Sequence, residues 1–174
     1  LRSWLNNKYT HLKHIELELK TFFEYLPVNS ILDGELYNHD MDFSTIVSAI
    51  KTTKSIHPKL KDISYWIFDI DYKDPKYLVP YEHRYALLVN SYKRYLEDGN
   101  IPLYFKIVQA QIANNHDDII RQHDEYVNTG YEGIMIKKIS NNIRTGNVYK
   151  MSLYKPGKNA NIMKYKNFKD EEAE

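Results

Sequence analysis

The sequence predicts an α+β fold in which largely antiparallel sheets are flanked by helices. Two amphipathic patterns, over residues 11–26 and 81–97, indicate helices, and several short β-branched and aromatic runs indicate strands. These elements do not follow a strict strand–helix alternation, which favours antiparallel pairing over a doubly wound parallel sheet. With 174 residues, 43% of them hydrophobic, the chain can bury one core, and a net charge of only +1 argues against disorder.

The first helix and the first two strands are separated by clear breaks. Apolar side chains recur at spacings of three and four over residues 11–26, and Pro27 ends the pattern. Residues 31–37 (ILDGELY) are predicted to form a short strand, in which Gly34 indicates a bend or a close backbone approach. Residues 63–72 (ISYWIFDIDY) are β-branched and aromatic, so we expect a mostly buried strand.

Two other helices are predicted from their capping residues. Asp42 or Ser44 can cap a helix, because their side-chain oxygens can accept from unsatisfied amide groups of the first turn. Asn115 or Asp117 can start another helix, which we expect to stop at Gly130. The buried face of the first of these two helices is predicted to hold Ile46, Val47 and Ile50.

The helix over residues 81–97 follows Pro80 and is expected to end near Gly99. It carries several of the chain's 16 tyrosines, which could stack on nucleic-acid bases. Their helical spacing favours packing in or around the core instead. The residues predicted to face inward are Leu88, Val89, Tyr92 and Leu96.

The remaining elements are short. Strands are predicted over residues 103–109, 133–139 and 161–168. The polar stretch 140–160 contains a Pro156-Gly157 turn signal and is interpreted as a hairpin or loop.

Charge is distributed unevenly along the chain. Residues 137–169 hold nine lysines and arginines without an acidic residue, whereas residues 170–174 hold four acids. Such a basic tract suggests a polyanionic partner or a phosphate site, although a solvated basic loop would look the same.

Several classes of protein are disfavoured. The absence of cysteine excludes disulfide scaffolds and cysteine-based zinc sites, and no Rossmann or Walker A pattern is found. No apolar stretch is long enough to span a membrane, and no export signal is recognisable, so an intracellular protein is expected. The scattered histidines lack a carboxylate at ligand spacing, which argues against a histidine metal site.

Charged groups at or beside the predicted strands could carry chemistry. Asp33 and Glu35 flank Gly34, and paired acids can hold a divalent ion or a ribose hydroxyl. Lys164 and Lys166 alternate on one strand, so both face the same side, where they could neutralise phosphate oxygens. Each pattern alone is more often a turn or an exposed strand face; together they describe a nucleotide site built on strands.

Four segments, taken in order, carry a more specific signal. They are LDGELY (32–37), YWIFDI (65–70), YEGIMIK (131–137) and IMKYKNF (162–168). In this order they resemble the later signature motifs of the covalent nucleotidyltransferases, and more narrowly the adenylation domain of ATP-dependent DNA ligases. The resemblance covers almost the whole chain: it implies a partial adenylation domain over residues 1–168 and the start of a linker to an OB-fold domain over residues 169–174.

This resemblance implies the sealing of nicks in duplex DNA, with ATP and Mg²⁺. A lysine would attack the α-phosphate of ATP and retain AMP, AMP would pass to the 5′-phosphate at the nick, and the 3′-hydroxyl would then displace it. Such chemistry requires an activated amine, a divalent cation and fixed positive charges near the phosphates. The implied partners are nicked DNA and an OB-fold domain of the same protein, with no membrane; a monomer is the simplest expectation.

The resemblance also assigns roles to individual residues. Glu35 and Glu132 would serve the metal, and Glu35 would also bind the ribose. Phe68 would stack on adenine, and Trp66, on the same strand face, could help to wall that pocket. The residues expected to bind the nucleotide are Arg2, Glu35, Phe68, Lys137, Lys164 and Lys166, and those expected near DNA phosphates are Arg144, Lys155 and Lys158.

Two departures from the family pattern bear on activity. The nucleophile motif K-x-D-G is missing, because Ile31 and Leu96 stand where its lysine would precede an Asp-Gly pair. We therefore expect a truncated chain, with the nucleophilic lysine upstream of Leu1, that is inactive alone. Lys158 stands where family members often have arginine, and lysine loses the bidentate geometry with phosphate.

Two alternatives stay open at this point. An RNA ligase or an mRNA-capping guanylyltransferase belongs to the same superfamily. The missing lysine also suits a non-catalytic domain that binds nucleotide or nucleic acid.

Overall fold

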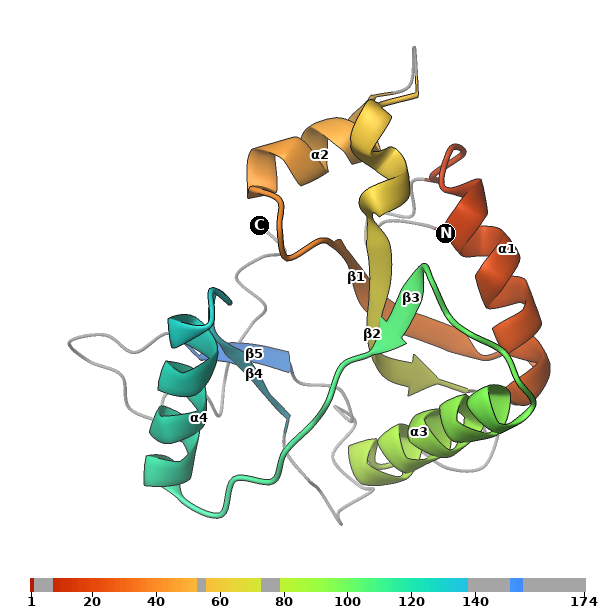
Figure 1. Ribbon diagram of the computed structural model, residues 1–174. Coiled ribbons are helices and arrows are strands. Elements are labelled where there is room, and N and C mark those ends of the chain that lie inside the picture. The colour runs from red at the N-terminus through yellow and green to blue at the C-terminus, as the bar shows by residue number, and fades with distance from the viewer. Residues whose placement is uncertain (2–7, 53–55, 73–78, 138–150, 155–174) are drawn as a thin grey trace. The chain divides into compact units, whose positions relative to one another are not determined.

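The computed structural model describes residues 1, 8–52, 56–72, 79–137 and the backbone of 151–154. The chain divides into two compact units, the first made of residues 1–75 and 83–109 and the second of residues 76–82 and 110–174 (Figure 1). The helices within the described part of the chain include none with the length and hydropathy of a membrane span.

The first unit contains a three-stranded sheet and most of the helices. Its order is α1 (Lys13–Phe22), a 3₁₀ turn (Phe23–Tyr25), β1 (Ile31–Tyr37), α2 (Phe43–Lys51), a second 3₁₀ turn (Pro58–Asp62), β2 (Ser64–Asp71), α3 (Tyr81–Glu97) and β3 (Phe105–Ile107). The first two residues of α3 group with the second unit. The helices and strands predicted for this unit are confirmed to within a few residues at their ends.

The sheet order is β1-β2-β3, with β1 and β2 antiparallel and β2 and β3 parallel. The α+β class with largely antiparallel pairing is confirmed, and the pairing of β3 with β2 is the parallel exception. A parallel pair needs a long crossover, and here α3 lies in that connection. The sheet of the first unit is therefore mixed.

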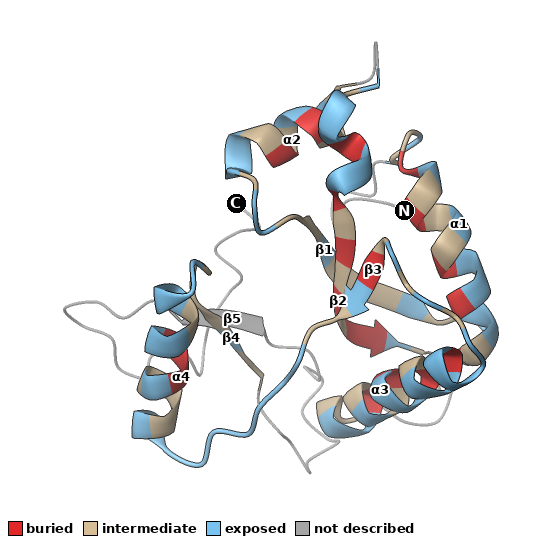
Figure 2. Cartoon of the chain, viewed as in Figure 1, coloured by how far each residue is buried: buried red, intermediate tan, exposed pale blue. Residues whose placement is uncertain are grey.

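The core of the first unit lies between α1, α3 and the sheet. Buried and half-buried residues alternate along β2 from Ser64 to Asp69, as expected for a strand with one face packed (Figure 2). Phe22 of α1 stacks on Phe105 of β3 with ring centroids 4.9 Å apart, and Tyr95 of α3 meets both rings edge to face. These contacts join helices and strands that are distant in sequence.

Two predicted helix faces need correction. In α3 the buried residues are Arg84, Leu88, Ser91 and Tyr95, whereas Val89 and Leu96 are exposed. The apolar spacing predicted the wrong inward residues, because a buried arginine and a buried serine complete the inward face of α3. In α2, Asp42 is confirmed as the cap, since its carboxylate accepts from the Thr45 amide; Ala49 is buried alongside Ile46 instead of Val47 or Ile50.

The second unit contains α4 (His116–Asn128), β4 (Ile134–Lys137) and β5 (Met151–Tyr154). Asn115 caps α4 by accepting from the amide of Asp118, and Gly130, with φ 93°, follows the helix end. β4 and β5 pair antiparallel. β5 was not predicted as a strand, because it lies inside the polar stretch 140–160 that was interpreted as a hairpin or loop. The strand predicted over residues 161–168 lies outside the described residues.

Candidate nucleotide site

The candidate site in the first unit starts from a close approach between two backbones at Gly34. A side chain at this position would collide with the backbone oxygen of Trp66 and crowd the ring of Tyr65. Only glycine therefore allows β1 to approach β2 this closely. The sequence pattern that suggested a close backbone approach is confirmed.

Beside Gly34 the register of the two strands shifts. Asp33 pairs with Asp69 and Gly34 pairs with Ile67, so Phe68 is an extra residue on β2. A bulge of this kind bends the strand and redirects a side chain. Phe68 is half-buried, and its spacing from Trp66 places it on the face opposite the buried Ile67.

Glu35 reaches the same face of the sheet by cross-strand pairing. It stands directly opposite Trp66, and its side chain is exposed. The Trp66 indole is fixed by a hydrogen bond that its Nε1 donates to Ser64 Oγ at 2.9 Å, and by the Tyr37 ring, which meets it edge to face. Glu35 and Phe68, predicted separately, thus share one face with Trp66.

An ion pair fixes the backbone immediately after Phe68. Asp69 accepts from Arg84 Nε at 3.0 Å and from Arg84 Nη2 at 2.8 Å, and also from the amide of Ile70. Asp69 is 1% exposed and Arg84 5% exposed, so the bidentate pair is almost fully removed from water. It ties the bulged end of β2 to α3. The sequence contained no periodic signal for this contact.

The second unit places the other predicted residues around β4. Glu132 is exposed just before this strand, and Lys137 is its last residue. The Lys137 ammonium lies 4.5 Å from the centroid of the Tyr81 ring, within the range of a cation–π contact. Tyr81 therefore limits the positions that Lys137 can adopt, a role that its sequence position did not reveal.

The described histidines and acids do not gather into a metal-binding group of three or more. The buried His123 instead contacts Asp124, with Nδ1 and Oδ1 3.0 Å apart.

The remaining predicted site residues lie outside the described residues. They are Arg2, Arg144, Lys155, Lys158, Lys164 and Lys166.

The sequence is also similar to known proteins. The sequence profile described as "ATP dependent DNA ligase domain" matches residues 2–166. The chain is 27% identical over 142 residues to a DNA ligase of African swine fever virus, isolate Tick/South Africa/Pretoriuskop Pr4/1996; the match covers 80% of this chain and 31% of that protein. It is also 27% identical over 139 residues to the DNA ligase of the isolate Warthog/Namibia/Wart80/1980, covering 79% and 30%. The chain thus spans about a third of the length of these relatives.

Proposed function

The chain belongs to the ATP-dependent DNA ligase domain family, and on this premise we propose that it binds the adenine nucleotide of a ligase that seals nicks in duplex DNA. The observation that carries the proposal is the shared sheet face of Glu35 and Phe68, with Trp66 between their strand positions. This face combines an acceptor for ribose hydroxyls with an aromatic surface for a base.

The sheet residues would orient the nucleotide for the attack of a lysine. Phe68 stacks on the adenine ring, and the Glu35 carboxylate accepts from a ribose hydroxyl. The bulge and the buried Asp69–Arg84 pair hold Phe68 in one orientation, which reduces the freedom lost when the base binds. Lys137, and from outside the described residues Lys164 and Lys166, supply positive charge to phosphate oxygens.

Two carboxylates fit the chemistry of Mg²⁺. Glu35 and, in the second unit, Glu132 are exposed acids, and Mg²⁺ is usually held by one or two carboxylates together with phosphate oxygens and water. When bound, Mg²⁺ offsets the negative charge that develops on the reacting phosphate.

The covalent steps require a lysine that the K-x-D-G motif would provide, and this motif is not in the chain. With that lysine present, its nitrogen bonds to the α-phosphorus and pyrophosphate leaves. AMP then passes to the 5′-phosphate of the nick and leaves when the 3′-hydroxyl attacks. We expect the isolated chain to bind ATP without forming a covalent adduct, and to need an OB-fold domain to hold DNA.

Calorimetric titration with ATP, GTP and AMP tests the nucleotide proposal. We expect binding of ATP in preference to GTP, weakened about tenfold by Phe68→Leu, since base stacking contributes about 1–3 kcal/mol. Phe43→Leu is the matched control, because Phe43 is 73% exposed on α2. Equal effects of the two substitutions, or preferential binding of GTP, would contradict the proposal.

Glu35→Gln and Glu97→Gln form a second matched pair, since both acids are exposed and Glu97 lies at the end of α3. We expect only Glu35→Gln to weaken ATP binding and to make that binding less dependent on added Mg²⁺.

Nick sealing distinguishes a DNA ligase from an RNA ligase. The assay uses a protein form in which a K-x-D-G segment precedes Leu1, with nicked DNA or RNA substrates. Capping activity with GTP would favour the guanylyltransferase alternative.

A further inference from the structure

A lysine outside all the predicted motifs lies on the same sheet face as Glu35 and Phe68. Lys106 is the central residue of β3, between the buried Phe105 and the half-buried Ile107. The strand register pairs Trp66 with Glu35 on one side and with Lys106 on the other. A carboxylate, an indole and an ammonium therefore form one row across the three strands.

The Lys106 side chain is folded over this face. Its Nζ lies 3.5 Å from the centroid of the Trp66 ring, and the indole is itself fixed by Ser64 and Tyr37. Partial burial also lowers the pKa of Lys106. Among the described residues no carboxylate forms an ion pair with Lys106, so its N–H donors are not engaged by a described acid.

The position of this ammonium relative to Glu35 defines what it can contact. Neighbouring strands are about 4.8 Å apart, so the positions of Glu35 and Lys106 are separated by about 10 Å across the sheet. That separation is of the size of a nucleoside. A ribose held at β1 by Glu35, with its base on the aromatic residues of β2, would direct the far edge of the base towards β3.

We infer that Lys106 is a base-binding residue, which donates a hydrogen bond to a ring-nitrogen acceptor on the edge of adenine remote from the ribose. An ammonium carries donors only, and the ring nitrogens of adenine are acceptors, so the pairing is complementary. Trp66 positions Lys106 by holding the ammonium over its ring face. This assignment rests on the proposed nucleotide function and adds a contact from the third strand.

The test compares Lys106→Met with Lys106→Arg in calorimetric titrations with ATP, AMP and adenosine. Methionine keeps much of the side-chain length and removes the charge, whereas arginine keeps both the cation and its N–H donors. We expect Lys106→Met to weaken all three ligands by a similar factor of about ten, as for loss of a hydrogen bond to a charged group. Lys106→Arg should retain most of the affinity.

Lys93→Met provides the control, since Lys93 is an exposed lysine on α3, and it should bind like the wild type. A loss confined to ATP would overturn the assignment, because the ammonium would then serve the phosphates. Unchanged binding by Lys106→Met would also overturn the assignment of Lys106. The proposed nucleotide function would still be tested separately by Phe68→Leu. No binding by the wild type would refute the proposed function and this assignment together.

Tryptophan fluorescence gives a local readout of the same row. In a Trp4→Phe background, Trp66 is the only tryptophan, and a bound base should change its emission. Replacing Trp66 with leucine removes the ring face and should weaken adenosine binding as Lys106→Met does; phenylalanine should preserve it. If the Trp66→Leu and Lys106→Met effects simply add in the double variant, Trp66 does not act through Lys106.

Discussion

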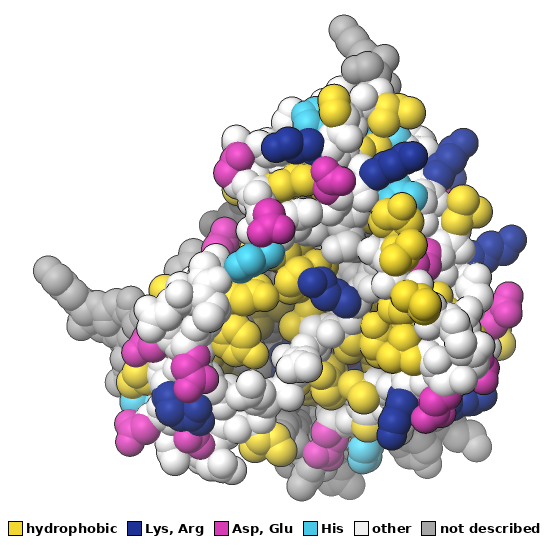
Figure 3. All heavy atoms as spheres, viewed as in Figure 1, with side chains coloured by type: hydrophobic (Ala, Val, Ile, Leu, Met, Phe, Trp, Pro, Cys, Tyr) yellow, Lys and Arg dark blue, Asp and Glu magenta, His cyan; other side chains and the backbone are white. Residues whose placement is uncertain are grey.

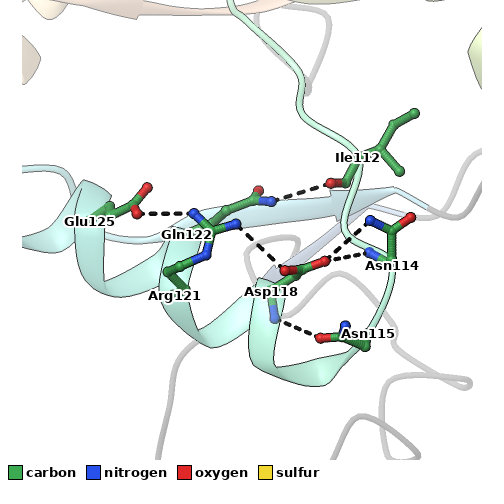
Figure 4. Close-up of polar contacts among 7 residues, drawn as sticks. All are labelled: Ile112, Asn114, Asn115, Asp118, Arg121, Gln122 and Glu125. Atoms are coloured by element: carbon green, nitrogen blue, oxygen red, sulfur yellow. Dashed lines mark hydrogen bonds and ion pairs between the residues drawn. The ribbon is translucent and has the colours of Figure 1, made fainter.

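The two units each contain an arginine that pairs with acidic residues, but one of these arginines is buried and the other is exposed. In the first unit Arg84 is buried and forms a bidentate pair with Asp69. In the second unit Arg121, on the exposed side of α4, contacts Asp118 and Glu125 at 3.5 and 3.0 Å (Figure 4). Figure 3 shows the exposed side of this contrast, with acidic side chains around a basic one over α4. Similar ionic groups are therefore placed in very different solvent environments.

This difference determines what each contact contributes. Water screens the Arg121 contacts, and holding long exposed side chains together costs entropy, so such pairs contribute little. Asp69 and Arg84 have lost their hydration, and either one without its partner is a buried charge. We therefore expect that breaking the buried pair destabilises the fold far more than breaking the exposed contacts does.

The largest effect is expected from Arg84→Met. Leaving the Asp69 carboxylate buried without its arginine should lower the free energy of unfolding by about 3–5 kcal/mol, as measured by urea denaturation. The double variant Asp69→Leu with Arg84→Met removes both charges and should recover much of this loss. A loss below about 1 kcal/mol for Arg84→Met would mean that the pair behaves like an exposed one.

Gly34→Ala is expected to have the next largest effect. The added methyl group would collide with the Trp66 backbone, so we expect a loss of about 1–3 kcal/mol in unfolding free energy from overpacking. Gly99→Asn is the comparison, because Gly99 has φ 84° but no atom lies within 4 Å of the place that a Cβ would occupy, and asparagine tolerates this backbone conformation. Equal losses for the two variants would show that close packing at Gly34 is not the cause.

Asn115→Ala is expected to have a moderate effect in the second unit. It removes the side-chain acceptor of the Asp118 amide at the start of α4, which should cost about 1 kcal/mol. Asn128→Ala, at the exposed end of the same helix, should be nearly neutral. Helicity and urea midpoints measured by circular dichroism distinguish the two variants.

The cap of α2 should respond to pH, because its capping side chain is the carboxylate of Asp42. Hydrogen bonds from the Ser44 hydroxyl, and from the hydroxyl and amide of Thr45, hold the pKa of Asp42 well below its usual range. Because the folded-state pKa is depressed, this stabilisation is complete above the unfolded pKa of about 4 and disappears as pH falls through the folded value. The difference in urea midpoint between wild type and Asp42→Asn should therefore shrink from pH 6 to pH 2.

The smallest effect is expected from Arg121→Met. Loss of its two exposed ion pairs should lower the urea midpoint only slightly, and this small decrease should vanish in 1 M salt. A loss comparable to that of Arg84→Met would remove the distinction between the two arginines.

The sequence alone determined the local elements of this protein and the order of its motifs. Periodicity and capping residues predicted α1, α3 and α4, since these signals depend on neighbours along one helix. The motif LDGELY predicted both the strand and the close approach at Gly34, because only glycine suits such contact. The resemblance of four ordered segments was sufficient to identify the family.

Only the tertiary structure decided which distant residues meet. The parallel pairing of β3, the Asp69–Arg84 pair and the position of Lys106 over Trp66 join segments that are separated in sequence. No periodic pattern in the sequence predicts these contacts, because strand register and side-chain burial depend on how the whole sheet packs. A lysine in a short strand and an arginine in a helix have ordinary sequence contexts, and their places in the site follow from the fold that brings three strands together.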